Sequence, residues 1–384
     1  MDTALYDLTP ATRLALLGVV IAVAPLVWLW LRHRRSAPAD RLRALTLLTL
    51  FLTFDLVLFG AFTRLTDSGL GCPDWPGCYG SSSPIGARDE IHAAQSAMPT
   101  GPVTHGKAWI EMVHRYLAMT VGVLITVLMI ASWLLRRRDP AAVVSPWWAT
   151  ATFAWVCVQG AFGALTVTMK LYPAIVTAHL LGGIAGVMLL AAQAQAGARQ
   201  PVVLTPGLRF AAWSLLGLLI AQCALGGWVS ANYAVLACTD FPTCQGSWWP
   251  PMDFGHAFVV RRELGLARDG GFLPFAALTA IHYVHRLVAY VVLLAMALLA
   301  RRLARSGAAG LRRFALGLAG LALWQLASGL SNVVLDWPIV AALAHTGGAA
   351  AAVALLTILL ARAGGAPRPE QTAAGAPALS RRPA

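Results

Sequence analysis

The segment EMVHRYLA, residues 111–118, stands at the start of a long apolar run. It places the carboxylate of Glu111 three residues before the imidazole of His114, so the two side chains share one face of a helix. Ionisable groups inside a membrane span are costly and usually functional. The pattern recurs as IHYVHRLVAY from Ile281, with His285 in the place of His114 and His282 in the place of Glu111. A duplicated His-Arg helix therefore organises the chain.

Composition defines the class of protein. Of the 384 residues, 58% are hydrophobic and only 12% are charged, which is too little polar surface for a soluble protein. The net charge of +13 comes from Arg residues clustered in short loops between apolar segments. That distribution is typical of membrane orientation, so we expect a bilayer environment and no nucleic-acid partner.

Apolar segments of about 20 residues can cross a hydrocarbon layer of about 30 Å. The first such segment precedes its basic cluster and lacks a small-residue cleavage site, so it is interpreted as a retained helix and not as a signal peptide. The sequence predicts nine spans near residues 13–31, 43–65, 109–135, 147–168, 173–195, 208–230, 278–300, 313–334 and 338–361.

Alternate loops differ in charge. By the positive-inside rule the Arg-rich loops face the cytoplasm, and the loops rich in Gly, Pro and Trp face outward. An odd number of spans then places the N-terminus outside and the C-terminus in the cytoplasm. The Arg-rich loops contain Arg32, Arg34, Arg35, Arg41 and Arg43, then Arg136 to Arg138, then Arg301, Arg302, Arg305, Arg312 and Arg313.

Matched spacings indicate an internal repeat of four helices, with the helix at 13–31 outside it. His114 and His285 are 171 residues apart, and this larger offset fits an insertion in the second outer loop. Three pairs are separated by 166 residues, namely Cys72 and Cys238, Cys78 and Cys244, and His179 and His345. The predicted fold is thus an all-α membrane protein of two pseudo-symmetric four-helix bundles plus one extra N-terminal helix.

Four of the histidines lie at similar depth, roughly 8–11 Å into helices that run inward from the outer face. Facing helices of a bundle hold cofactors between them, and a histidine from each of two helices can clamp a haem iron from both sides. The alternative is a histidine hydrogen-bonded within the protein interior. Four at one depth in a duplicated chain favour haem ligation by His114, His179, His285 and His345. For His282 we leave open a structural or a supporting role.

Two polar patterns leave alternatives open. Cys72 with Cys78 and Cys238 with Cys244 can each close a small disulfide on the oxidising side of the membrane. There are two alternatives: the four thiolates bind one zinc ion, or a disulfide above a cofactor is redox-active.

Arg115 and Arg286, which follow their histidines, either pair with haem propionates or face the membrane interface.

At these residues the chain resembles the haem A synthase family. The similar segments are GAFTRLTDSGLGCPDWPGCYG from Gly60, EMVHRYLA from Glu111, AHLLGG from Ala178, IHYVHRLVAY from Ile281 and AHTGGA from Ala344. The resemblance covers residues 43–361. It implies an enzyme that oxidises a ring methyl of haem O to the formyl group of haem A, which serves terminal cytochrome oxidases.

The resemblance also implies roles for single residues. His285 and His345 are implied to hold a haem b cofactor, and His114 and His179 to flank the substrate. Glu111 is implied to be catalytic, and Cys72 with Cys78 to form a pair in the outer loop. The location it implies is a bacterial inner membrane, with an unidentified electron-transfer partner and an association with haem O synthase. The predicted domains are residues 1–42 with the extra helix and a basic loop, 43–200 with the substrate haem site, 201–363 with the haem b site, and 364–384 as a disordered cytoplasmic tail.

The residues themselves favour a division of labour between the halves. Two identical histidine pairs would be redundant, but Glu111 occupies the position that His282 holds in the other half. A carboxylate next to a reacting macrocycle can transfer protons or stabilise a cationic centre. The competing hypotheses are a dihaem electron carrier of the cytochrome b type and a non-catalytic haem transporter or chaperone.

Overall fold

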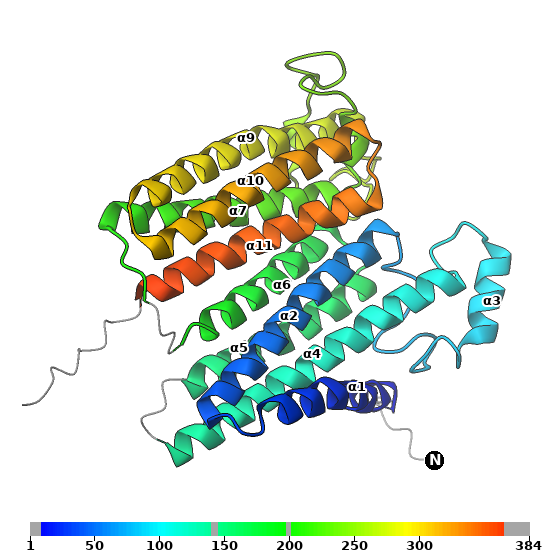
Figure 1. Cartoon of the computed structure of the whole chain (residues 1–384). Helices are drawn as coiled ribbons and strands as arrows, with labels where there is room; N and C mark the ends of the chain where they lie inside the picture. The colour runs from blue at the N-terminus through cyan, green and yellow to red at the C-terminus, as the bar shows by residue number, and fades with distance from the viewer. Residues whose placement is uncertain (1–8, 140–144, 197–200, 365–384) are drawn as a thin grey trace, which may run out of the picture.

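The structure, a computed structural model, describes residues 9–139, 145–196 and 201–364. Every regular element in these residues is a helix (Figure 1), and nine of the helices are long and apolar enough to cross a membrane. These are α1 (Thr9–His33), α2 (Pro38–Leu65), α4 (His105–Arg138), α5 (Pro146–Thr168), α6 (Pro173–Gln193), α7 (Pro206–Ala231), α9 (Phe275–Arg305), α10 (Ala309–Val334) and α11 (Ile339–Gly364). The prediction of an all-α chain with nine spans is confirmed.

Three short helices in the outer loops were not predicted. They are α3 (Arg88–Ala97), the 3-10 helix η1 (Val235–Ala237) and α8 (Phe254–Ala257). None is long enough to span a membrane, so the search for long apolar runs does not detect them. α3 has acidic residues in its first turn and buries Ile91 completely, a charge pattern that suits a helix N-terminus.

The spanning helices form two groups. α2, α4, α5 and α6 pack against one another in sequence order around a ring, and α7, α9, α10 and α11 repeat the arrangement. The two groups meet where α6 contacts α7 and α11, and where α11 contacts α2 (Figure 1). This arrangement is consistent with the predicted pair of bundles. The tail predicted for 364–384 lies outside the described residues, except for Gly364 at the end of α11.

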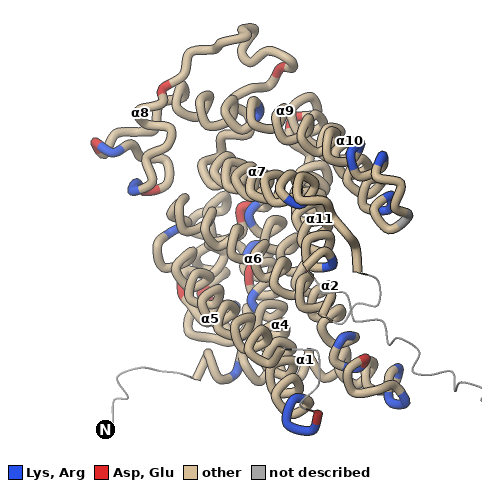
Figure 2. Tube along the Cα trace, turned by 90° about the vertical axis from the view of Figure 1, so that its left-hand side faces the viewer, with Lys and Arg blue, Asp and Glu red and all other residues tan. Residues whose placement is uncertain are grey.

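Helix ends follow ordinary capping rules. Proline stands in the first turn of α2, α5, α6 and α7, where its missing N–H costs no hydrogen bond. Arginines occupy the last turns of α1, α4, α9 and α11, where they complement the helix dipole. Figure 2 shows the Lys and Arg residues gathered mainly at helix ends and in loops.

At the basic end of the molecule, one arginine joins the two halves and a second holds two helices of the N-terminal half together. Arg362 Nε donates to Gln195 Oε1 at 2.8 Å, and Arg43 Nε donates to the carbonyl oxygen of Ala194 at 3.3 Å. The basic ends of α2 and α11 are therefore tied to the end of α6. The assignment of this side to the cytoplasm stays a prediction.

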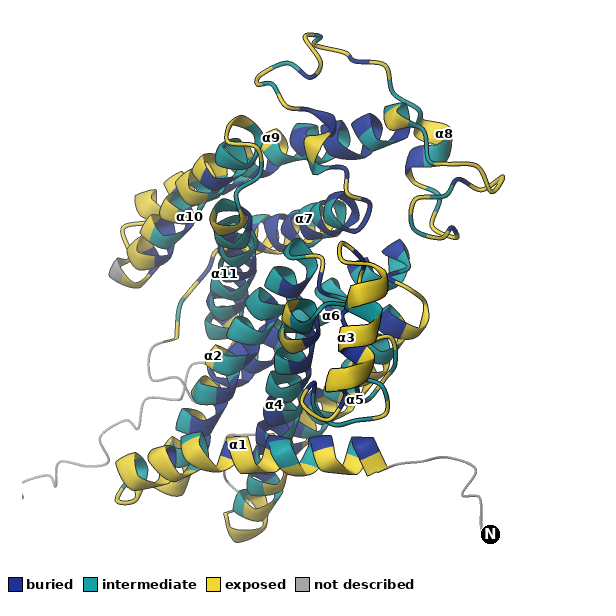
Figure 3. Ribbon diagram, turned by 90° about the vertical axis from the view of Figure 1, so that its right-hand side faces the viewer, coloured by how far each residue is buried: buried dark blue, intermediate teal, exposed yellow. Residues whose placement is uncertain are grey.

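α1 lies along the outside of the first bundle, with much of its surface exposed (Figure 3). It packs on α4 and α2. Gly18 lets α1 come close to α4, since a Cβ added at Gly18 would lie 2.8 Å from Cβ of Met119 in α4. Leu14 is buried in the same apolar cluster as Cys72 and Cys78. The extra helix thus covers the side of the N-terminal bundle, next to the outer loop.

Candidate functional site

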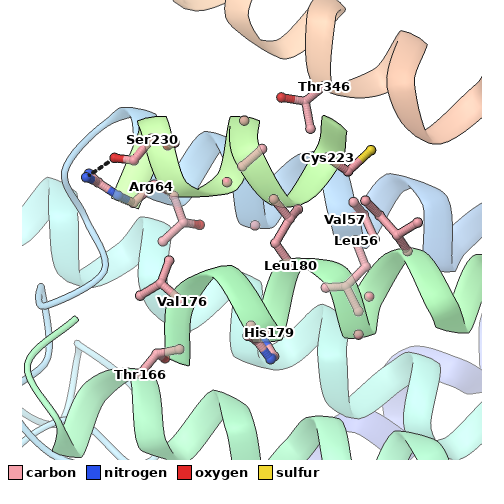
Figure 4. A pocket seen from close by; sticks show the side chains of 18 of the residues that line it. Leu56, Val57, Arg64, Thr166, Val176, His179, Leu180, Cys223, Ser230 and Thr346 are labelled. Carbon is pink, nitrogen blue, oxygen red and sulfur yellow. Dashed lines mark hydrogen bonds between the residues drawn. The ribbon is translucent and has the colours of Figure 1, made fainter. Parts of the chain in front are cut away.

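One large cavity runs through the bundles. Its volume is about 1300 Å³, which exceeds the roughly 300–1,000 Å³ of ordinary small-molecule sites. Its walls are mostly apolar and come from both halves, as Figure 4 shows for Leu56 and Val57 of α2, His179 of α6 and Cys223 of α7. The predicted site residues that line it are Glu111, His114, His179, His285 and His345.

In the C-terminal half, the two predicted ligands face each other. The ring centroids of His285 and His345 are 6.5 Å apart, with the ring planes at 81°. Metal–imidazole bonds are about 2.0 Å long, so the gap between these rings is one that a single metal ion can bridge. Glycines give both rings room. A Cβ added at Gly226 or at Gly329 would lie 3.1 Å from Cε1 of its histidine.

In the N-terminal half, the equivalent histidines have similar surroundings. His114 stacks on Phe59, with centroids 6.2 Å apart and planes at 5°. Gly60 and Gly163 lie against the rings of His114 and His179, as Gly226 and Gly329 do in the other half. Nδ1 of both histidines is buried without a hydrogen-bond partner in the described part of the chain. Both pairs thus have cavity-lining imidazoles with space beside them, which fits ligation of a flat metal-bearing macrocycle.

Glu111 is held between the cavity and the outer loop of residues 72–78. Its Oε2 accepts a hydrogen bond from the backbone N–H of Cys72 at 2.7 Å, and its Oε1 forms a buried ion pair with Arg115 at 2.5 Å. The side chain is almost fully buried, yet it lines the cavity. The carboxylate therefore connects the disulfide loop to the cavity wall in the first bundle.

Arg115 lines the cavity and is bound to the outer loop of residues 72–78. Its Nη1 donates to the carbonyl oxygens of Asp74 at 3.0 Å and Pro76 at 3.1 Å, and to that of Gly77. In the other half, Arg286 Nη1 donates in the same way to Asp240 at 3.0 Å and Thr243 at 2.7 Å. Arg115 binds its outer loop to α4, and Arg286 binds its outer loop to α9. Both contacts form because each loop folds back over the start of its helix.

His282 shares one contact with Glu111, that to the arginine four residues later, and differs in the other. Its Nδ1 lies 3.1 Å from the carbonyl oxygen of Ala234, and its Nε2 lies 3.4 Å from Arg286. His282 also lines the cavity, so both a structural and a supporting role stay predictions for it. The asymmetry between the two positions remains: a carboxylate lines the cavity in one half, and a hydrogen-bonded imidazole in the other.

The four outer cysteines form two disulfides, Cys72–Cys78 and Cys238–Cys244. The zinc alternative is therefore contradicted, because each sulfur is bonded to another sulfur. Asp74 closes the first loop by accepting from the N–H groups of Tyr79 and Gly80, and Asp240 closes the second in the same way. A hydrogen bond from the Thr243 hydroxyl, with backbone N–H bonds, lowers the pKa of Asp240.

Sequence reasoning missed the polar residues beside the second histidine pair. The amide nitrogen of Gln222 lies 3.1 Å from Nδ1 of His285, and Oγ of Ser328 lies 3.0 Å from Nδ1 of His345. Gln325 donates to the backbone oxygen of His345 at 2.9 Å. Polar residues inside otherwise apolar spans were the available signal, since such residues usually face a bundle interior or a cavity.

The loop contacts give a stability prediction. Replacing Arg115 with Met keeps the length of the side chain but leaves Glu111 buried without its ionic partner. Removing one member of a buried ion pair costs about 3–5 kcal/mol, so we expect a clear fall in the unfolding temperature of the purified protein in detergent. Arg137→Met, at the exposed basic end of α4, is the matched control. Equal unfolding temperatures for the two variants would contradict this role for Arg115.

Fold and site together define a multi-pass helical membrane protein with two pairs of histidines inside its spans. The sequence profile of the COX15-CtaA family, described as cytochrome oxidase assembly proteins, matches residues 43–358. The chain belongs to this family. The match begins within α2, so α1 lies outside it.

Several bacterial proteins that are similar to this chain are named heme A synthase. The heme A synthase of Shewanella oneidensis is 39% identical over 317 residues, which cover 81% of this chain and 93% of that protein. The heme A synthase of a Methylobacterium species is 31% identical over 340 residues, or 81% of this chain and 88% of the relative. That of Caulobacter vibrioides is 28% identical over 331 residues, covering 80% and 91%.

Proposed function

We propose that this protein is an enzyme of haem A synthesis that oxidises the ring methyl of haem O to a formyl group, for use in terminal cytochrome oxidases. Family membership and the relatives named heme A synthase support the reaction. The observation that carries the proposal is the asymmetry of the cavity, in which Glu111 lies near one histidine pair and has no carboxylate counterpart near the other.

We assign the C-terminal half to the cofactor. His285 and His345 would hold a haem b, which supplies electron transfer when it is bound. Because both histidines of this half would hold the resident haem, neither would be left to bind a substrate. The facing rings and the glycines beside them support the assignment.

We assign the N-terminal half to the substrate. His114 and His179 would flank haem O, and the apolar walls of the large cavity suit its hydrocarbon tail. Two successive hydroxylations of the methyl carbon, each a two-electron oxidation that requires an external oxidant and an oxygen donor, would give a geminal diol, which loses water to leave the aldehyde. Glu111 is the proton-transferring or charge-stabilising group for these steps, because it is the carboxylate that lines the cavity in this half.

The setting of the reaction is also part of the proposal. The nine spans place the protein in a membrane, which we take to be the bacterial inner membrane with the N-terminus outside and the C-terminus in the cytoplasm. The disulfide-bearing loops then lie on the oxidising side. We also propose that the protein exchanges electrons with a partner and associates with haem O synthase.

The test is co-expression of this chain with a haem O-producing enzyme in a host that lacks haem A. The non-covalent haems are extracted and identified by chromatography and mass spectrometry. Haem A or its hydroxylated precursor is the expected product. Recovery of haem O alone, from cells in which the protein is present and folded, would overturn the proposal in favour of a dihaem electron carrier.

A further inference from the structure

The two histidine pairs differ in the residues near Nδ1 of each ring. The glycines that contact the rings show which residues of the two halves correspond. Gly60 and Gly226 lie against His114 and His285, and Gly163 and Gly329 lie against His179 and His345. Each glycine pair is 166 residues apart. At the same offset, Gln222 of α7 corresponds to Leu56 of α2, and Ser328 of α10 corresponds to Phe162 of α5.

In the C-terminal half, a polar group stands at Nδ1 of each imidazole. The Ser328 hydroxyl donates to the carbonyl oxygen of Trp324 at 2.7 Å, so at 3.0 Å its oxygen is free to accept from Nδ1–H of His345. That tautomer leaves the lone pair of Nε2 available to a metal. Gln222 lies 3.1 Å from Nδ1 of His285, and its Oε1 has no hydrogen-bond partner in the described residues. The same amide nitrogen donates to the backbone oxygen of His285 at 3.0 Å, so Gln222 holds this residue both at its backbone and at the Nδ1 edge of its ring.

In the N-terminal half, these polar groups are replaced by hydrocarbon. Leu56 and Phe162 have no hydrogen-bonding side-chain atoms, and Nδ1 of His114 and of His179 is buried without a partner in the part of the chain that the structure describes. Among the described residues, no hydrogen bond at Nδ1 therefore fixes the tautomer of either ring. The four residues that differ lie on four helices, and each of the four histidines has one of them at the corresponding position.

We propose that Gln222 and Ser328 are positioning residues that make the C-terminal half a permanent haem site, and that Leu56 and Phe162 keep the N-terminal half exchangeable. The proposal rests on the proposed function, because only a substrate has to leave its site after reaction. A hydrogen-bond acceptor at Nδ1 orients a ligating imidazole and raises its basicity, and loss of such a contact typically weakens metal binding about 10–100-fold.

The first test uses the purified full chain carrying its tightly bound haem. In Ser328→Ala and Gln222→Leu we expect the haem to transfer to an excess of apo-globin about 10–100-fold faster than in the unaltered protein. In Ser328→Ala we also expect the reduction potential to rise, because an imidazole without its Nδ1 acceptor is less basic and stabilises ferric iron less. Ser328→Thr, which keeps the hydroxyl, should restore both values. The control is Ser331→Ala on the same helix, since the Ser331 hydroxyl bonds only to the carbonyl oxygen of Ala327.

The second test is reciprocal. The double variant Leu56→Gln with Phe162→Ser supplies the missing groups to the N-terminal pair, and we expect haem bound there to be released about 10–100-fold more slowly. Unchanged transfer rates in Ser328→Ala and Gln222→Leu with an unchanged potential in Ser328→Ala, or unchanged release in the double variant, would overturn the proposal. These readouts do not require conversion of haem O, so a chain that fails to make haem A but shows the expected retention would overturn only the proposed function.

Discussion

Replacing Glu111 with Gln should lower the rate of haem O conversion by about 10²–10⁴-fold, the usual contribution of a positioned acid or base. The change removes the ion pair with Arg115, so we expect a lower unfolding temperature. The amide oxygen can still accept from the backbone N–H of Cys72, and Arg115 keeps its bonds to loop carbonyls, so we expect the folded variant to bind haem. The measurement is the ratio of haem A to haem O extracted from cells that co-express the variant with a haem O-producing enzyme.

Asp55 provides a matched control for Glu111. It is a second carboxylate within a span, near the middle of α2, but it is absent from the cavity wall and has no hydrogen bond or ion pair within the described ranges. Asp55→Asn should leave the haem ratio as in the unaltered protein. Full conversion by Glu111→Gln would remove the catalytic role of this carboxylate and leave it only the contact with the loop.

Replacing His345 with Ala should remove the tightly held haem of the C-terminal half. The loss of an axial ligand is expected to weaken haem binding by more than the about 10–100-fold that the loss of a supporting contact costs. The low-spin haem spectrum of the purified protein should disappear, and conversion of haem O should stop with it. His285→Ala should give the same result, because the two rings face each other across one gap.

His256→Ala is the control for these variants. This histidine lies in an outer loop, in α8, and pairs with Asp253 at 2.6 Å, away from the wall of the cavity. Its removal should leave the haem spectrum unchanged. If His345→Ala retained haem as tightly as His256→Ala, the assignment of His345 as a ligand would be wrong.

Much of the fold was predictable from the sequence because a membrane span needs a long apolar run. The nine predicted spans match α1, α2, α4 to α7 and α9 to α11 closely. The start of α4 at His105, earlier than the predicted residue 109, was missed because its first turn is polar. α3 and α8 were missed for the same physical reason, since short helices on the water-exposed side have no apolar length to reveal them.

The candidate site was predictable only in its repeated parts. Matched spacing singled out the four histidines, and the structure brings all four to one cavity. The contact of Arg115 with loop carbonyls depends on the path of residues 72–78, which no local pattern encodes. Gln222 and Ser328 are single polar residues in apolar helices, and their significance appears only when the helices place them at Nδ1 of a histidine.

We propose that the two halves of the protein hold chemically different macrocycles. This proposal is tested most directly by purifying the protein from cells that also make haem O, and measuring the amount and identity of each extracted haem by mass. The account predicts haem b together with haem O, haem A or the hydroxylated precursor, with haem b alone lost in His345→Ala. Two equivalents of haem b and no other haem would contradict it, and would identify the chain as an electron carrier.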